Sequence, residues 1–158
     1  MKNLILLLVL ICSSAFAVQV PVPEFAKYIN DLTGTLTRSE VNTLTNQIKA
    51  LTQKNYAQLV VLVVETTGDE TIEQYATRVF DSWKPGDKDH DDGVLLLVAW
   101  QDHTVRIEIG YGLEGIITDA QSGKIIRNSI IPAFKKGDLA GGLQKGINDI
   151  ESRLAENT

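Results

Sequence analysis

The sequence alternates between continuous apolar runs and segments in which apolar residues recur at helical spacing. Two runs, at residues 57–65 and 93–100, are almost entirely apolar and rich in valine and leucine. Such runs are typical of strands buried on both faces, as in the centre of an α/β sheet. Residues 104–110 instead alternate apolar and polar side chains, and they begin only a few positions after the second run. This spacing predicts an antiparallel hairpin.

Four further segments repeat apolar residues every three or four positions, the spacing of one helix face. Their predicted starts are Thr37, residue 69, Thr118 and Asp138. Glu40 and Gln121 stand three residues after the two threonines, so each pair matches a capping box. We expect the third helix to end near Pro132, because proline lacks the N–H that a helix interior needs. Glycines near the apolar stripe of the fourth helix indicate close packing against a neighbour; they are Gly141, Gly142 and Gly146.

Two short segments precede the first helix. Residues 18–24 are expected to be extended because two X-Pro pairs disfavour helix, and residues 29–35 form a short strand or loop. The element order predicts a three-layer α/β/α sandwich, with a mixed sheet, a C-terminal antiparallel hairpin pair and four main helices. No repeat or linker divides the sequence, so we expect one domain over residues 18–158.

The first seventeen residues have the organisation of a secretory signal peptide. Lys2 precedes an apolar run at residues 4–12, and Ala15 and Ala17 occupy the −3 and −1 positions of a cleavage site. The run is shorter than the roughly 20 residues that a membrane-spanning helix needs. We therefore expect export to the periplasm or beyond the cell, with no membrane span left after cleavage.

Charge and cysteine content narrow the classes of function. The sequence has 15 basic and 20 acidic residues, and its formal net charge is −5. This acidic balance argues against binding to a nucleic-acid backbone. The single cysteine, Cys12, leaves with the signal peptide. The exported chain then has no disulfide, thiolate metal site or cysteine nucleophile, and we expect it to be a monomer.

Residues 110–115 match the pattern G-x-G-x-x-G directly after a predicted strand. In a dinucleotide-binding site these glycines open a helix within a parallel strand–helix–strand unit. Here the strand is the antiparallel arm of a hairpin, and the next helix begins several residues later. We therefore interpret the glycines as a turn that accepts positive φ angles.

The segment at residues 87–92 carries four aspartates. It is not an EF-hand, which needs glycine at position 6 and glutamate at position 12 of its loop. Counted from Asp87, these positions hold Asp92 and Val98. If the hairpin turns at Asp102, however, the end of this segment lies beside the glycines of residues 110–115.

The hairpin therefore gathers carboxylates at one end of the sheet. These are Asp91, Asp92, Glu108 and Glu114, with Asp119 a short loop away. Converging carboxylates repel one another, and a hard cation is the usual compensation. With only two histidines and no cysteine, Ca²⁺ or Mg²⁺ is favoured over zinc. The alternatives are neutralisation by Arg106, Lys124 or solvent, and an acidic loop that is only a solvated surface.

Two motifs carry a specific resemblance. They are Asp-Gly-Val-Leu-Leu-Leu-Val at residues 92–98 and Arg-Ile-Glu-Ile-Gly-Tyr-Gly-Leu-Glu at residues 106–114. With weaker matches from residue 22 to about residue 154, the sequence resembles the TPM domain family. That family includes plant thylakoid-lumen photosystem II repair proteins and many exported bacterial proteins.

The resemblance implies an α/β/α sandwich, divalent-cation binding in some members, and weak acid phosphatase activity in a plant member. It adds Asp31 to the candidate metal ligands, which are then Asp31, Asp91, Asp92, Glu108, Glu114 and Asp119. Other family positions are expected to shape the site; they are Gly93, Arg106, Gly110, Tyr111 and Gly112. Many bacterial members continue into a transmembrane helix, whereas this sequence ends at Thr158, so we expect no direct membrane attachment.

Our leading hypothesis is an exported, divalent-cation-binding TPM-like domain. It would act as an accessory or interaction module in envelope protein maintenance, with envelope or membrane proteins as partners. The alternative is a metal-assisted phosphatase, in which Asp92 or Asp119 activates water or attacks phosphorus and Arg106 holds the phosphate. A third hypothesis is a structural binding domain whose site is a protein groove.

Overall fold

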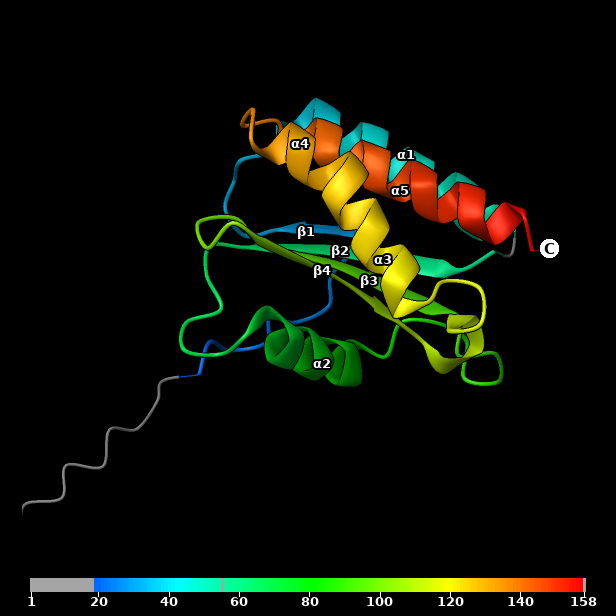
Figure 1. The fold of residues 1–158 in the computed structure, drawn as a ribbon. Helices are drawn as coiled ribbons and strands as arrows, with labels where there is room; N and C mark the ends of the chain where they lie inside the picture. The colour runs from blue at the N-terminus through cyan, green and yellow to red at the C-terminus, as the bar shows by residue number, and fades with distance from the viewer. Residues whose placement is uncertain (1–18, 55, 158) are drawn as a thin grey trace, which may run out of the picture.

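The computed structural model describes residues 19–54 and 56–157 (Figure 1). The predicted signal peptide, residues 1–17, lies outside these residues. The described chain forms a four-stranded sheet with helices on both faces, which confirms the predicted α/β/α sandwich. In sheet order the strands are β1 (Ile29–Asp31), β2 (Gln58–Val64), β3 (Gly93–Ala99) and β4 (Thr104–Ile109).

The sheet is mixed, as predicted. Strands β1, β2 and β3 are parallel, and β4 pairs antiparallel with β3. In the hairpin Val94 lies opposite Ile109 and Ala99 opposite Thr104. The chain therefore reverses direction within residues 100–103, which include Asp102. The residues before β3 and those after β4 consequently lie at the same end of the sheet.

The helices divide unequally between the two faces (Figure 1). One face carries α1, the stretch from α3 to α4, and α5, whereas α2 covers the other face. The helix bounds are α1 (Arg38–Gln53), α2 (Ile72–Trp83), α3 (Asp119–Ile125), α4 (Ile131–Phe134) and α5 (Leu139–Ala155). Two other turns are the 3₁₀ turn η1 (Tyr111–Leu113) and the π turn η2 (Ile126–Ile130). Since α3, η2 and α4 are continuous, the predicted count of four main helices holds.

The continuous apolar runs contribute side chains to two separate cores, one on each face of the sheet. Successive strand residues point to opposite faces, so both faces of a buried strand must be apolar. In β2, Leu59, Val61 and Val63 contribute to the core under α1 and α5. Val60 and Leu62 contribute to the core under α2.

The second helix begins later than the sequence suggested. Its predicted start was residue 69, but the N-cap is Thr71 and the helix starts at Ile72. Thr71 Oγ1 accepts a hydrogen bond from Gln74 N (3.2 Å), and Gln74 Oε1 accepts one from Thr71 N (3.1 Å). This capping box fixes the start, because it satisfies two N–H groups that have no partner inside the helix.

The third helical stretch, formed by α3, η2 and α4, ends at Phe134, near Pro132 as predicted. Its path was not predicted: the wider π turn η2 comes first, and Pro132 then lies in the first turn of α4. A proline is tolerated there because its missing N–H is not needed. The predicted close packing in the last helix is confirmed: a Cβ on Gly142 would lie 2.3 Å from Phe134 Cε1, and one on Gly146 would lie 2.7 Å from Ile130 Cδ1.

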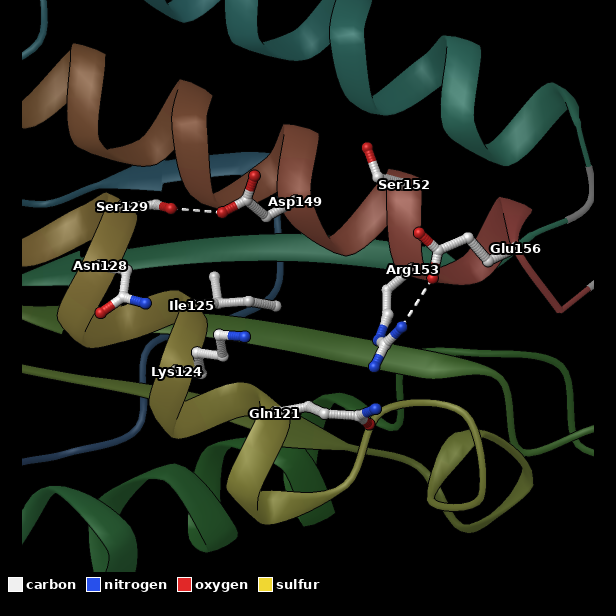
Figure 2. Close-up of a pocket in the computed structure, with 9 residues that line it drawn as sticks. All are labelled: Gln121, Lys124, Ile125, Asn128, Ser129, Asp149, Ser152, Arg153 and Glu156. Atoms are coloured by element: carbon white, nitrogen blue, oxygen red, sulfur yellow. Dashed lines mark hydrogen bonds and ion pairs between the residues drawn. The ribbon is translucent and has the colours of Figure 1, made fainter.

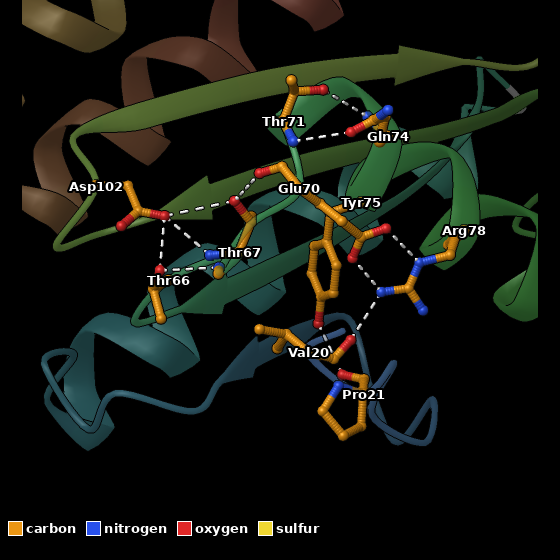
Figure 3. Close-up of polar contacts among 11 residues, drawn as sticks. Val20, Pro21, Thr66, Thr67, Glu70, Thr71, Gln74, Tyr75, Arg78 and Asp102 are labelled. Atoms are coloured by element: carbon orange, nitrogen blue, oxygen red, sulfur yellow. Dashed lines mark hydrogen bonds and ion pairs between the residues drawn. The ribbon is translucent and has the colours of Figure 1, made fainter. Parts of the chain in front are cut away.

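Residues 19–25, named here the N-terminal strap, lie along α2 (Figure 3). Three side chains of α2 donate hydrogen bonds to strap carbonyls: Arg78 to Val20 (2.7 Å), Tyr75 to Pro21 (2.9 Å) and Trp83 to Pro23 (2.7 Å). Val20 and Val22 also pack against the core under α2. The strap thus completes a layer that otherwise consists of a single helix.

Two carboxylates fix the loop that leads into α2 (Figure 3). Glu70 receives two hydrogen bonds from the Arg78 guanidinium. Asp102 Oδ2, in the hairpin turn, accepts hydrogen bonds from Thr66 Oγ1 (3.0 Å) and Thr67 N (2.8 Å). These acidic groups hold loops at the carboxyl ends of the parallel strands.

Candidate functional site

The predicted meeting of the acidic segment and the glycines is confirmed. Residues 87–92, named the acidic loop, lie directly against residues 110–114, named the glycine bend. Gly110 N donates to Gly93 O (2.8 Å), and Gly112 N donates to Asp91 O (3.1 Å). On the other side of β3, Gln58 N donates to Asp92 O (2.9 Å). Backbone bonds therefore clamp the end of the acidic loop from both neighbouring strands.

The glycines of the bend are needed for close approach and not for positive φ, which corrects the sequence interpretation. Gly110 has a φ of −67°. A Cβ on Gly110 would lie 2.2 Å from Asp91 O, and one on Gly112 would lie 1.8 Å from His90 O. Only glycine allows two backbones to pack this closely. Between them Tyr111 is directed outward, with 81% of its surface exposed.

Short hydrogen bonds organise the acidic loop from within. Asp87 Oδ1 accepts from Asp89 N (2.8 Å) and lies 3.0 Å from His90 Nδ1. Asp92 Oδ1 accepts from Asp87 N (2.7 Å). The hydrogen bond from Asp89 N, followed by that from His90, lowers the pKa of Asp87. In turn, the hydrogen bond and charge of Asp87 raise the pKa of His90, and Asp92 adds to this effect.

The loop carboxylates border two different cavities. Asp87, His90 and Asp92 line one of about 420 Å³, together with the start of β2. Asp91, whose φ is +48°, lines another of about 510 Å³ beside Lys88. Asp91 and Asp92 are adjacent in sequence, yet they contribute to separate surfaces.

The predicted ligands on β4 and α3 already have a cationic partner. Arg106 Nε donates to Glu108 Oε2 (3.0 Å), and Arg106 Nη2 lies 3.6 Å from Asp119 Oδ1. This is the neutralisation that the sequence left open as an alternative. Glu114 is exposed and forms no ion pair with any described residue.

Asp31 lies at the opposite end of the sheet from the acidic loop. It ends β1 opposite Val63, whereas the acidic loop leads into the start of β3. Its Oδ1 accepts from Thr33 N (2.9 Å) and its Oδ2 from Leu36 N (2.8 Å), so it holds the turn before α1. The fold therefore does not bring Asp31 to the other candidates. Among the described residues, no three histidine, cysteine, aspartate or glutamate side chains converge closely enough to hold one metal ion.

Comparison with known proteins identifies the domain. The family model of the TPM domain matches residues 29–153. The chain belongs to the TPM domain family. The family match covers every element of the sheet and extends almost to the end of α5.

Three solved structures share the fold of this TPM domain. The N-terminal domain of a protein from P. gingivalis is 26% identical, with 83% of each chain covered and a TM-score of 0.75. BA42 from the psychrophilic bacterium Bizionia argentinensis is 26% identical over 79% of this chain and 85% of that one, with a TM-score of 0.66. The N-terminal domain of cg2496 from Corynebacterium glutamicum is 17% identical over 85% of each chain, with a TM-score of 0.65. Among curated proteins, none matches the chain at a significant level.

Within the described part of this TPM domain, no helix is both long and apolar enough to cross a bilayer.

Sequence reasoning also missed a polar cavity of about 350 Å³ between α3–η2 and α5 (Figure 2). Ser129 donates a hydrogen bond to Asp149 there, and Arg153 Nη1 lies 2.6 Å from Glu156 Oε2. No motif indicates this cavity, because its lining comes from two separate helical stretches. Only their packing brings together residues such as Ser129 and Asp149, which are 20 positions apart.

Proposed function

We propose that this TPM domain is an exported binding module whose acidic loop takes up a hydrated divalent cation. The observation that supports this is the cavity lined by Asp87, His90 and Asp92. In both aspartates Oδ1 accepts a backbone hydrogen bond, while Oδ2 has no hydrogen-bond partner among the described residues. The carboxylates are thus held in place with one oxygen each left to bind.

The donor set favours Mg²⁺ over Ca²⁺. Mg²⁺ usually keeps several waters and binds through one or two carboxylates, whereas Ca²⁺ takes six to eight oxygen ligands. The cavity offers two aspartates, of which Asp92 was a predicted ligand and Asp87 was not. The other predicted ligands do not line it: Glu108 and Asp119 are paired with Arg106, Asp31 lies at the far end of the sheet, Asp91 lines a separate cavity and Glu114 is exposed. A water-rich Mg²⁺ site is the better fit to this number of oxygens.

The module would act as an accessory in envelope protein maintenance, with envelope or membrane proteins as partners. The predicted signal peptide supports the location. The exposed Tyr111, fixed next to the acidic loop by two glycines, supports a role in contact, because aromatic side chains are enriched at protein interfaces. The cation would set the charge of the surface that a partner meets.

Titration calorimetry with Mg²⁺ and with Ca²⁺ tests the cation site. We expect binding at about 0.1–1 mM, in the range of weak extracellular sites. Asp92→Asn keeps an oxygen that can accept from Asp87 N but removes a charge, and it should abolish the heat. Bound cation should also lower the pKa of His90, as followed by NMR, because two like charges would then share the cavity.

Asp69→Asn is the matched control, since Asp69 is exposed and lies just before α2, outside the acidic loop. It removes the same charge and should leave the binding unchanged. Absence of heat and of any His90 shift at about 10 mM of either cation would contradict the proposal. So would an equal loss of binding in both variants.

The phosphatase alternative has less support from the arrangement of charges. A phosphate dianion needs a free cationic partner, and Arg106 is paired with Glu108 and Asp119. Turnover of a chromogenic phosphate ester that is lost in both Asp92→Asn and Asp119→Asn would nevertheless assign the reaction to this domain.

A further inference from the structure

A second surface at the same end of the sheet has a different chemistry. A cavity of about 580 Å³ lies beside the start of β2, between the end of the N-terminal strap, α1 and the end of α2. This volume falls in the range of roughly 300–1,000 Å³ that ligand sites occupy. We name it the lysine groove, because three lysines line it: Lys27, Lys49 and Lys84.

The three lysines are free of carboxylate partners. No described residue forms an ion pair with any of them, although the whole protein carries a net charge of −5. Other cations of this chain do pair, as Lys54 does with Glu151 at 2.6 Å. The groove is therefore a local concentration of positive charge on an acidic protein, and such a region attracts anionic groups.

Aromatic rings supply the apolar part of the groove. Phe25 and Trp83 both line it, with their ring centroids 5.3 Å apart. Phe25 is 53% exposed, which is unusual for a ring of this size, and Trp83 is partly buried. The indole N–H is already bonded to Pro23 O (2.7 Å), so Trp83 offers only its apolar surface. Exposed aromatic surface rimmed by charge is typical of a binding site.

The end of α2 brings Lys84 to the groove. Lys84 is the C-cap of α2, with a φ of +46°, and its backbone N–H donates to Phe80 O (2.8 Å). Helices commonly end with a residue in this left-handed conformation. The cap ends the helix next to Trp83, and the exposed Lys84 lines the groove beside that ring.

We propose that the lysine groove binds an acidic, extended peptide segment of another protein. Its carboxylates would meet the lysines, and one apolar side chain would pack against Phe25 and Trp83. A flat lipid surface fits less well, because the three lysines line a recess between α1 and the end of α2. An extended peptide can enter such a recess, whereas the surface of a bilayer cannot.

The neighbouring acidic loop gives the bound peptide a direction. Thr52 and Gln58 line both the lysine groove and the cavity of Asp87 and Asp92. A carboxylate displaced toward the acidic loop would be repelled there, so the acidic part of the peptide stays near the lysines. Thr52 Oγ1 is buried without a hydrogen-bond partner among the described residues, and it lies where the two surfaces join.

Fluorescence anisotropy with labelled hexapeptides tests the proposal. The probes alternate aspartate or glutamate with one central phenylalanine or leucine, and a second set carries lysine in place of each acid. We expect the acidic set alone to bind, with a Kd below about 1 mM at low salt. The double variant Lys49→Glu and Lys84→Glu should weaken binding by at least about tenfold.

A double variant with Lys136→Glu and Lys145→Glu changes the net charge equally at exposed positions outside the groove, and it should bind as the wild type does. Acidic peptides that fail to bind at about 1 mM would overturn the proposal. Equal weakening in both double variants would do the same. Binding to phosphatidylglycerol vesicles that depends on Lys49 and Lys84, without peptide binding, would replace it with a membrane contact. None of these readouts involves the divalent cation.

Discussion

At the scale of single residues, the glycine bend is the most constrained part of the candidate site. Gly110 and Gly112 pack directly on the carbonyls of Asp91 and His90. The backbones of the glycine bend and the acidic loop therefore lie in direct contact, with no room for a side chain between them. The geometry of the acidic loop depends on these glycines as much as on its own aspartates.

Replacement of Gly112 by alanine should be costly. The new Cβ would lie 1.8 Å from His90 O, so the bend must move away from the loop. We expect a loss of about 1–3 kcal/mol in the free energy of unfolding, measured by urea denaturation.

Gly115→Ala is the control, because a Cβ at Gly115 has no heavy atom within 4 Å. Its effect should stay within about 0.5 kcal/mol. Equal stabilities for the two variants would show that the bend is not packed on the loop in solution.

At the scale of secondary-structure elements, three helices begin with the same device. Thr37, Thr71 and Thr118 each accept a hydrogen bond from the backbone three residues later, and the side chain at that position bonds back. These capping boxes set where helices start on both faces of the sheet. They also align the loops that precede the helices.

Thr71→Ala should therefore destabilise α2. It removes the acceptor for Gln74 N, and we expect a loss of about 1 kcal/mol. Thr77→Ala is a matched change on the same helix, where Thr77 is exposed and donates only to Glu73 O.

The control should be neutral or slightly stabilising, since alanine is the better helix former. Thermal unfolding followed by circular dichroism would compare the two variants. A larger loss for Thr77→Ala than for Thr71→Ala would contradict the role of the cap.

The elements themselves could be predicted because their signals are local. Each repeat of the apolar pattern and each of the two predicted capping boxes involves residues only three or four positions apart. The hairpin follows from the short gap before residue 104. The start of α2 and the path through Pro132 were missed, because a cap at Thr71 and a π turn overrode the simpler pattern.

The candidate site was only partly predictable, since it depends on where side chains point. Pairing in the hairpin brought the acidic loop to the glycine bend, as expected. The pattern did not reveal that Asp91 and Asp92 border different cavities, or that Arg106 occupies Glu108 and Asp119. The lysine groove left no motif, because its lysines come from three segments that are far apart in the sequence.

At the scale of the whole molecule, the sheet is protected unequally. Three helical segments cover one face, whereas the other has α2 and the N-terminal strap. The strap contributes three carbonyl acceptors and two packed valines to that thinner layer. Its loss should expose part of the core under α2.

A chain that begins at residue 26 tests this. Compared with one that begins at residue 19, it should lose about 2–5 kcal/mol of unfolding free energy, from apolar burial and hydrogen bonds together. Hydrogen exchange should accelerate mainly in α2. Tyr75→Phe removes only the bond to Pro21 and should cost about 1 kcal/mol. Unchanged stability of the shortened chain would show that the strap is not bound.

The position of the strap also has a consequence for the predicted cleavage site. It is described from Gln19, two positions after the predicted cleavage at Ala17. Two residues of extended chain span only about 7 Å. If the chain is cleaved after Ala17, as the sequence predicts, the new N-terminus therefore lies within about 7 Å of the strap that covers α2.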